Sequence, residues 1–481
     1  MKTLRRIRSC ILLLPLLLAG ARAQQSMPGN APATPHQQQQ KPAQSGDMPG
    51  MQMGKPGENS AADFLPQIGE QTGPGGGPVY QLAGLEEKAL KGNPTLSESD
   101  NGVDTAKAHR RQVGLWPNPT MGYIGDEIAG GLGVNGGRQG GFVEQTIILG
   151  RKLYLAQQVA GADVKIADLA REEQRYRVQN AIRAAYFQTL AGQEMVALAE
   201  QYVKLTAATL ETAQRLHNIG ARDESEVAMA EIEMERAKLA ADVQRAHLQQ
   251  EWENLRSVVG DPALPVGQLA GKLDADLPQL DSRQLVDALV ANSPAMKMAQ
   301  ASATRAEASV EETRRQAVPD LRVRAGLEQN LETNDLTGKP YGLEGFAEVR
   351  VELPIFNRNQ GNVAAARTEL ERSRAETRRV ELQLRQQAAM AVEQYEAARM
   401  TVESYQKQII PRQQRLYEMQ RNAWGRMALS YPQVLSAQQG LFTAQAEYIH
   451  ALESLRTSAV ALSGFLLTDG LMAPGAGPGE R

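Results

Sequence analysis

The sequence is poor in cysteine, in aromatic residues and in long apolar runs, and each shortage narrows what the chain can be. Its one cysteine, Cys10, lies near the start, so we expect the mature chain to have neither a disulfide nor a lipidated N-terminal cysteine. Only 5% of residues are aromatic while 42% are hydrophobic, which favours long helices packed through small side chains. No later stretch supplies the ~20 consecutive apolar residues of a membrane helix.

Recognisable reaction chemistry is also missing from the sequence. We find no P-loop, nucleophile elbow or Cys/His cluster, and the five histidines, at 36, 109, 217, 247 and 450, show no metal-ligand spacing. A net charge of -3 leaves no basic excess to neutralise phosphates, so a nucleic-acid partner is not expected. The sequence therefore predicts neither an enzyme nor a bound cofactor.

The N-terminus carries an export signal followed by a low-complexity arm. Residues 1–23 combine a basic start, an apolar run from Ile11 to Leu18 and a small-x-small site ending at Ala23, which predicts a signal peptide cleaved there. Residues 24–78 are rich in Gln, Pro and Gly and are expected to be disordered. Within this arm, Met48, Met51 and Met53 offer thioethers suited to Cu(I) or Ag(I); the alternative is a linker in which methionines happen to cluster.

The remaining chain is a duplication, with one repeat at 79–262, a second at 283–467 and a flexible tail at 468–481. Asn93-Pro94 returns as Ser293-Pro294, and Pro119 returns as Pro319. Each repeat is expected to hold a short helix, a second helix, a β-hairpin, a helix of about 65 residues and a last helix after a glycine break. The strands are expected at about 120–127, 142–149, 320–328 and 346–353.

The strand before Pro354 alternates strictly, with Ala347, Val349 and Val351 on one face. One apolar and one polar face over about nine residues is typical of an outer-membrane barrel strand, although a soluble sandwich has the same alternation. Four strands cannot close a barrel around water, so the barrel requires several chains. The charged residues of the polar faces would then face the lumen of that barrel; the alternative is that they are simply solvated. These residues are Glu144, Arg322, Arg324, Glu328, Glu348, Arg350 and Glu352.

Heptad spacing runs through the helices, as at Leu384, Ala388, Ala391, Tyr395, Ala398, Val402, Tyr405 and Ile409, and again at Val434, Ala437, Leu441, Ala444, Tyr448, Ala451 and Leu455. The lengths allow two shorter helices, stacked end to end, to lie beside each long one. The result is a tube with the glycine breaks at one end and all the strands at the other. Pro411 is expected to kink its helix.

Three segments in this order, GLWPNPTMGY at 114–123, RLHNIGARDESEV at 215–227 and ELPIFNRNQG at 352–361, resemble the TolC-like outer-membrane efflux family, most of all its heavy-metal branch. The resemblance implies a mainly α fold with β strands: a homotrimer with a 12-stranded outer-membrane barrel and a periplasmic helical tunnel. It also implies a passive exit duct that works with a periplasmic membrane-fusion adaptor and a proton-driven inner-membrane resistance-nodulation-division pump.

In that family the adaptor contacts the helix-turn-helix tips. The tips map onto Gly220, Ala221, Arg222, Asp223 and Glu224 in the first repeat and onto Gly425, Arg426, Met427 and Ala428 in the second. The same glycines also fit ordinary helix C-caps. The cargo implied is heavy-metal cations such as copper/silver or cobalt/zinc/cadmium. Alternatives are a drug-efflux or type I secretion duct of the same fold, a soluble periplasmic coiled-coil protein, or a periplasmic metal-binding protein that uses the methionine arm.

Overall fold

The computed structural model describes residues 78–127, 137–280, 282–334 and 336–474. The chain divides into two units, Met1–Glu58 and Asn59–Arg481, and the first lies outside the described residues. All the described residues belong to the second unit. The expected signal peptide, and the arm up to residue 77, fall outside the described residues too.

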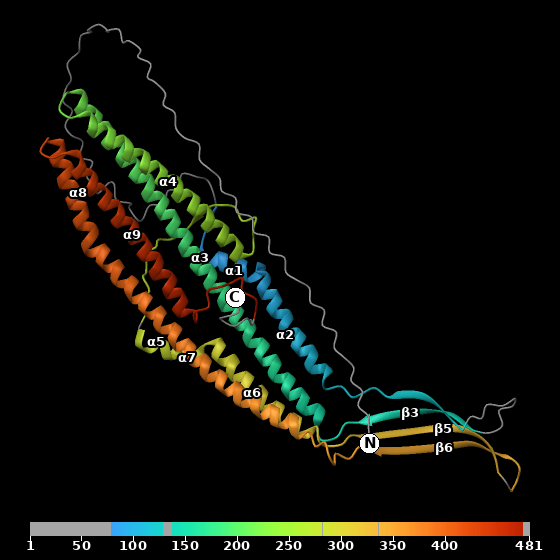
Figure 1. Cartoon of the computed structure of the whole chain (residues 1–481). Helices are drawn as coiled ribbons and strands as arrows, with labels where there is room; N and C mark the ends of the chain where they lie inside the picture. The colour runs from blue at the N-terminus through green and yellow to red at the C-terminus, as the bar shows by residue number, and fades with distance from the viewer. Residues whose placement is uncertain (1–77, 128–136, 281, 335, 475–481) are drawn as a thin grey trace, which may run out of the picture. The chain divides into compact units, whose positions relative to one another are not determined.

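Two sets of elements follow one another in the same order (Figure 1). The first set is α1 (Leu82–Gly92), α2 (Pro94–Gln112), β2 (Thr120–Asp126), β3 (Arg138–Ile147), α3 (Lys152–Asn218) and α4 (Glu224–Val259). The second is α5 (Ser282–Asn292), α6 (Pro294–Arg315), β5 (Leu321–Thr333), β6 (Pro340–Val351), α7 (Gln360–Ser404), the π-helix η2 (Tyr405–Ile409), α8 (Ile410–Gly425) and α9 (Tyr431–Ser463). A short pair, β1 (Val79–Tyr80) and β4 (Gln268–Leu269), is parallel.

The long helices lie side by side, and shorter helices are stacked along them. α3 packs against α2 and α4 on one side and against α6 and α9 on the other, while α7 packs against α6 and α9. Asn93 stands at the joint between α2 and α4: its side chain caps α2 by accepting from the backbone N–H of Thr95 (3.0 Å) and donates to the carbonyl of Val258 (2.9 Å). The end-to-end stacking expected from the helix lengths is therefore present.

The kink expected at Pro411 takes the form of the π-helical turn η2. The backbone N–H of Ile410 bonds to the carbonyl of Tyr405, five residues back, because Pro411 lacks an N–H and its ring crowds the preceding turn. The slip in register ends the heptad seam. Leu384 to Val402 are buried at the expected positions, but Tyr405 and Ile409 are only half-buried.

The core has two clusters. The larger surrounds the middle of α3, where residues such as Ile182, Leu190 and Trp252 pack against α1, α4, α7 and α9. The smaller lies near the far ends of the helices and contains Tyr417, Trp424 and Tyr431 with alanines from α3, α4 and α9. Small alanines at these seams allow the helices to approach closely.

The four longer strands form one antiparallel sheet in the order β2-β3-β5-β6. The sheet lies at the end of the helices opposite to the α3–α4 and α8–α9 turns (Figure 1). The strand boundaries differ from those expected. β3 begins at Arg138, before the expected start at about 142, whereas β5 extends to Thr333 and β6 begins at Pro340, beyond the expected bounds at about 328 and 346. Pairing explains the difference, since Gly140 and Asn330 gain ladder partners in Glu328 and Gly342.

Candidate functional site

The turn between α3 and α4 is a Schellman motif. Gly220 has a φ of +71°, its N–H bonds to the carbonyl of His217 (2.8 Å), and the next N–H, of Ala221, bonds to that of Leu216 (2.9 Å). Both bonds satisfy carbonyls that the end of α3 would leave without a partner. Glycine is favoured here because the left-handed conformation costs a residue with a Cβ about 1 kcal/mol.

The turn between α8 and α9 repeats the motif with a different residue at its critical position. Gly425 is still part of α8, and the left-handed residue is Met427, with a φ of +63°. The N–H of Met427 donates to the carbonyl of Trp424, and the N–H of Ala428 donates to the carbonyl of Ala423, both at 2.9 Å. The expectation that Gly425 could serve as the C-cap is therefore wrong, since Gly425 is the last residue of α8 and the C-cap is Arg426.

Buried polar contacts tie the two turns together. Arg222 donates to the carbonyl of Leu429 (2.6 Å), and its guanidinium lies 3.5 Å from Glu226. Glu226 is buried and accepts from the Trp424 indole N–H (3.3 Å) and the Tyr431 backbone N–H (3.2 Å). The four groups thus form one cluster across two turns about two hundred residues apart in sequence.

A second polar link, one heptad further along α4, joins α4 to α3 and α9. Buried Glu233 accepts from the Tyr202 hydroxyl (2.6 Å) and from the Gln439 amide (2.9 Å). The Tyr202 ring stacks on Phe442 with centroids 4.3 Å apart. Burial, followed by the hydrogen bond to Glu233, raises the pKa of Tyr202, so the hydroxyl remains a donor at physiological pH.

The predicted tip residues are brought together by this arrangement but differ in exposure. Most are exposed: Gly220, Asp223, Glu224, Gly425, Arg426, Met427 and Ala428. Ala221 and Arg222 are half-buried, and Arg222 is engaged across the cluster. Sequence reasoning missed Glu226, Trp424 and Tyr431, although a tryptophan and a tyrosine flanking a helix break were a visible signal. It also missed Ile219, which is 71% exposed.

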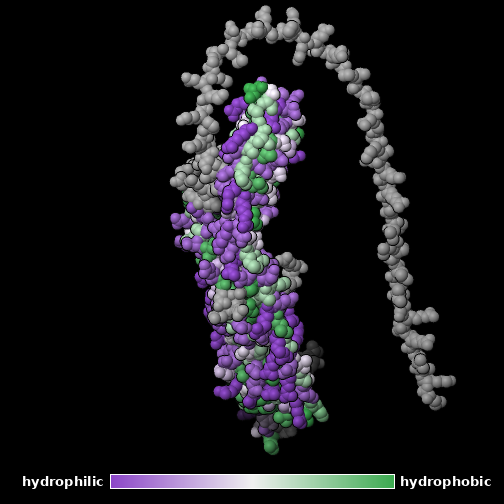
Figure 2. All heavy atoms as spheres, turned by 90° about the vertical axis from the view of Figure 1, so that its left-hand side faces the viewer, coloured by the Kyte–Doolittle hydropathy of each residue, from purple (hydrophilic) through white to green (hydrophobic). Residues whose placement is uncertain are grey.

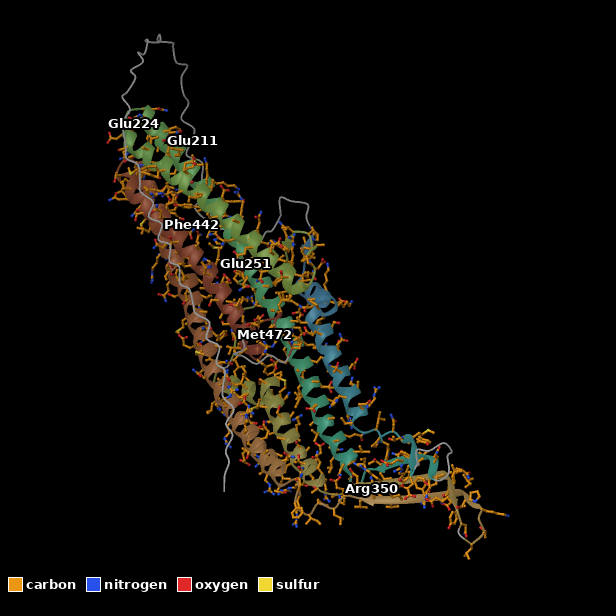
Figure 3. All side chains as sticks on the ribbon, turned by 45° about the vertical axis from the view of Figure 1, so that its right-hand side comes forward. Glu211, Glu224, Glu251, Arg350, Phe442 and Met472 are labelled. Carbon is orange, nitrogen blue, oxygen red and sulfur yellow. The ribbon has the colours of Figure 1, made fainter. Side chains whose placement is uncertain are left out.

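The sheet lies at the opposite end of the unit, as the positions of Glu224 and Arg350 show (Figure 3). Its apolar face is the more exposed one: Leu327 is 60% exposed, while the side chain of its neighbour Glu328, on the polar face, is only 13% exposed. Leu343 and Val349 on β6 and Met121 on β2 are exposed as well. A water-soluble sheet would shelter its apolar face, so this arrangement favours an apolar surrounding.

The register places the predicted lumen residues on the polar face, with one exception; Arg322 and Arg350 are exposed there. Glu144, Arg324 and Glu348 lie in one row across β3, β5 and β6, and Arg322 pairs with Arg350 in the next. Glu328 lies further from the helices. Glu352 does not belong to this set, because β6 ends at Val351 before the chain reaches Pro354, which cannot donate to a ladder.

Arg324 stacks between two aromatic rings of the polar face. Its guanidinium lies 3.6 Å from the centroid of the Phe142 ring and 5.7 Å from that of Phe346. The rings lie over glycines of the neighbouring strands: a Cβ on Gly122 would come within 2.5 Å of Phe142, and one on Gly326 within 2.8 Å of Phe346. Glycine is required here to make room for the rings.

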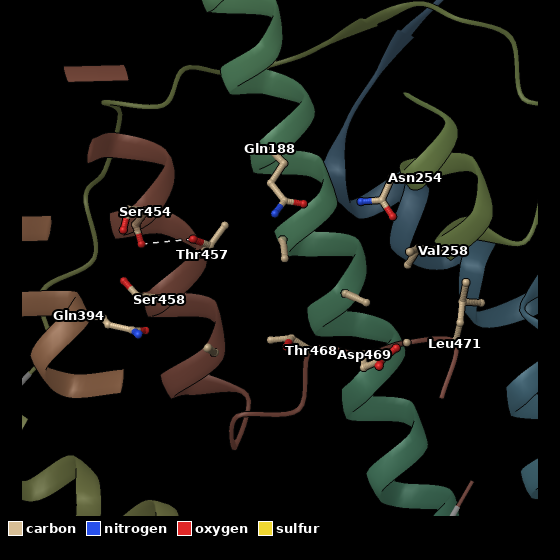
Figure 4. Close-up of a pocket in the computed structure, with 14 residues that line it drawn as sticks. Gln188, Asn254, Val258, Gln394, Ser454, Thr457, Ser458, Thr468, Asp469 and Leu471 are labelled. Carbon is tan, nitrogen blue, oxygen red and sulfur yellow. Dashed lines mark hydrogen bonds between the residues drawn. The ribbon is translucent and has the colours of Figure 1, made fainter. Parts of the chain in front are cut away.

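A recess of about 530 Å³ lies among α3, α4, α7, α9 and the segment after α9 (Figure 4). Its polar lining consists mainly of amides and hydroxyls, including those of Gln188, Asn254 and Thr457. Such groups suit water and supply no nucleophile paired with a base. The recess therefore gives no indication of catalysis.

The described residues contain neither a candidate metal site nor a membrane-spanning helix. No group of three or more His, Cys, Asp or Glu residues there could hold a metal ion. None of the helices in this part of the chain is apolar over enough of its length to cross a membrane. The methionines Met48, Met51 and Met53 lie outside the described residues.

Comparison with known proteins matches both repeats. The family model for outer membrane efflux proteins matches residues 85–261 and 285–466. Among curated relatives, the cobalt-zinc-cadmium resistance protein CzcC of Cupriavidus metallidurans is 24% identical over 390 residues, which cover 81% of this chain and 90% of that protein. The match therefore extends over nearly the whole of the described unit.

Solved structures share the fold at low sequence identity. The structure of CusC superposes with a TM-score of 0.69 at 17% identity and covers 80% of this chain and 92% of that one. The outer membrane protein VceC from Vibrio cholerae gives a TM-score of 0.65 at 16% identity, with 81% and 96% covered. With the family model matched over most of its length, this chain belongs to the outer membrane efflux protein family.

Proposed function

We propose that this chain is the outer-membrane exit duct of a tripartite export system for heavy-metal cations. The observation that carries the proposal is the exposure of the apolar face of the sheet, where Leu327, Val349 and Met121 are exposed, while Arg324 and Glu328 on the polar face are mostly sheltered. That inversion fits a sheet with lipid on one side and a water-filled lumen on the other. On this view, residues 1–23 direct export and are removed after Ala23.

A barrel needs more strands than one chain provides, so the proposal includes a homotrimer of twelve strands. The helices support an edge-to-edge assembly. Since α3 packs on α4 and α9, and α9 packs on α7 and α8, α4 lies at one edge and α7–α8 at the other. Both edges expose apolar residues, namely Ile232, Leu239 and Val243 on α4 and Leu382, Met390, Met400 and Met419 on α7–α8.

The exposed apolar residues at both edges are few, and the one face seen in Figure 2 is mostly hydrophilic with narrow hydrophobic strips. Narrow strips of this kind suit contact between helices of neighbouring copies, and a head-to-tail contact that closes on itself forms a ring. The outer-membrane sheet and the helical wall would then share one symmetry axis.

The paired turns are the proposed docking surface for the periplasmic adaptor. Ile219 and Met427 are apolar, exposed and presented by neighbouring turns, and an exposed apolar residue on a rigid turn is a suitable anchor for a partner. Exchanging both for serine should reduce cross-linking to the adaptor while leaving assembly of the duct intact. Unchanged cross-linking would show that the adaptor docks on another surface.

The cargo is proposed from the relative CzcC, whose name states cobalt, zinc and cadmium resistance. Deleting this chain's gene should raise sensitivity to one or a few metals more than to unrelated drugs. Complementation with the intact gene is the control. Equal sensitivity to unrelated drugs without a metal effect would contradict the metal assignment and favour a drug duct of the same fold.

The methionine arm is proposed to capture soft cations through Met48, Met51 and Met53, since thioethers bind Cu(I) and Ag(I). Exchanging the three methionines for leucine keeps the apolar bulk and removes the ligands. Reduced copper or silver tolerance in that variant would support capture. Unchanged tolerance would leave the arm as a linker.

A further inference from the structure

The register of the sheet arranges the charges of its polar face in rows that cross the strands. The row nearest the helices joins Arg322 to Arg350, and the next joins Glu144, Arg324 and Glu348. Successive rows are two residues apart along each strand, or about 6.6 Å. Near the helices, arginines therefore outnumber glutamates in the paired rows.

The sign of the charge reverses further along the strands. After the row of phenylalanines, Glu328 pairs with Glu344, and a last row joins Asp126 to Arg138. The Arg138 guanidinium lies 3.9 Å from Glu328 and 3.7 Å from Glu332, so this one arginine is shared between carboxylates. Carboxylates therefore predominate at the end of the sheet far from the helices.

The Arg324 stack marks the boundary between the two regions. Rings on two strands hold the guanidinium, and the Arg324 side chain is only 19% exposed. Its nearer Glu348 oxygen is 4.0 Å away. Because the rings restrict its movement, Arg324 presents a charge fixed in position, and a fixed charge acts on a passing ion more strongly than a mobile one.

We infer that the charge on this face changes sign along the length of the duct, and that Glu328 and Glu344 make its outer mouth select small hydrated inorganic cations over anions. Rings of like charge in a confined aqueous pore concentrate counter-ions and repel co-ions. Arg322 and Arg350, at the end of the sheet nearest the helices, attract anions and repel cations. The inference rests on the proposed function, because the polar face must line a water-filled lumen. An uneven distribution of fixed charge also predicts that the current depends on the sign of the voltage.

The test is conductance of the purified full-length protein in planar lipid bilayers, with KCl at different concentrations on the two sides. The double variant Glu328→Gln/Glu344→Gln should lower the permeability ratio of K⁺ to Cl⁻ at least about twofold near 0.01 M salt, where the Debye length is about 30 Å. Arg322→Gln should raise the ratio. Glu87→Gln, an exposed residue of α1, is the matched control and should leave it unchanged.

The outcomes separate the inference from the proposed function. Opposite shifts for the two variants, shrinking near 1 M salt where the Debye length is about 3 Å, support the graded lumen. Channels that form normally but show a symmetric current–voltage curve, or no shift in either variant, would overturn the inference and leave the duct intact. Failure of the unmodified protein to form any channel would instead contradict the proposed function.

Discussion

Glu226 accepts a hydrogen bond from the indole of Trp424, 198 residues further along the chain, and so joins the turns of the two repeats. The same carboxylate lies 3.5 Å from Arg222 and accepts from the backbone of Tyr431. Three donors converge on one buried acidic group. The two turns therefore behave as a single surface, whose geometry depends on this carboxylate.

Removing the charge of Glu226 should loosen that surface. Glu226→Gln leaves Arg222 half-buried beside a neutral group and should cost roughly 1–3 kcal/mol of stability, because breaking a charged hydrogen-bonded contact costs more than breaking a neutral one. Trp424→Phe removes the N–H and part of the buried indole, and should cost about 2–3 kcal/mol from the lost hydrogen bond and the cavity together. Thermal unfolding measures both changes, and a double-mutant cycle should show coupling. Additive effects would contradict a shared cluster.

The two left-handed residues of the turns should respond in opposite directions to substitution. Gly220→Ala should destabilise by about 1 kcal/mol, because a Cβ is disfavoured at positive φ, although nothing lies within 4 Å of the added atom. Met427→Gly should stabilise by a similar amount, about 1 kcal/mol. Met427→Ala is the matched control, since it shortens the side chain and retains the strain. A loss of stability in Met427→Gly would indicate that the side chain matters more than the backbone.

Glycines beneath the aromatic rings should be essential for the sheet, whereas a glycine on the opposite face should not. A Cβ on Gly326 would lie 2.4 Å from the carbonyl oxygen of Gly141, so Gly326→Ala should prevent correct strand pairing. In Gly345→Ala the nearest atom, of Leu327, is 3.6 Å away, an ordinary contact. Heat-stable oligomer on a denaturing gel should be lost in the first variant and kept in the second. Equal behaviour would contradict the described register.

Glu194 should make stability depend on pH. Burial, helped by the nearby charge of Asp274 and opposed by the Leu273 N–H and Lys272, raises the pKa of Glu194 from 4.5 to about 7. The folded state then binds a proton that the unfolded state has released, so stability falls as the pH rises from about 4.5 to 7. Glu194→Gln can still accept from Leu273 and should stabilise by about 2 kcal/mol at pH 8. Unfolding curves at pH 5 and pH 8 should differ less in the variant, and an unaltered difference would count against this assignment.

The helix edges should control assembly. Leu239→Glu places a charge in the middle of the exposed strip on α4 and should convert the complex to single chains, because an unpaired charge is costly in a buried contact. Lys238→Gln, at the neighbouring exposed position, is the control. The mass of the detergent-extracted complex distinguishes the two. Normal assembly of Leu239→Glu would exclude this edge from the interface.

Much of the fold could be predicted because its signals are local or repeated. The Asn93-Pro94 and Ser293-Pro294 pairs mark helix starts through the fixed φ of proline, to which Asn93 adds a side-chain cap, and strict alternation around Val349 marks β6. The lengths of the strands were harder to predict from the sequence. Gly140 favours a loop in isolation, and the ladder extends to it only through its partners Ile124 on β2 and Glu328 on β5, the second far away in sequence.

The site was predicted less completely because its key contacts cross between repeats. The turns around Gly220 and Gly425 were located by their glycines, but which residue takes the left-handed conformation depends on where α8 ends. The contact of Glu226 with Trp424 connects positions whose spacing carries no local pattern. Similarly, alternation placed Arg324 on the polar face, but only the register across three strands brings it onto Phe142.

The most direct test of the duct is membrane fractionation followed by mass determination of the native complex extracted in detergent. The account predicts that the protein is found in the outer-membrane fraction as a complex of three copies. A monomer or dimer in the soluble periplasmic fraction would contradict it, because the exposed apolar face of the sheet would then have no lipid to contact.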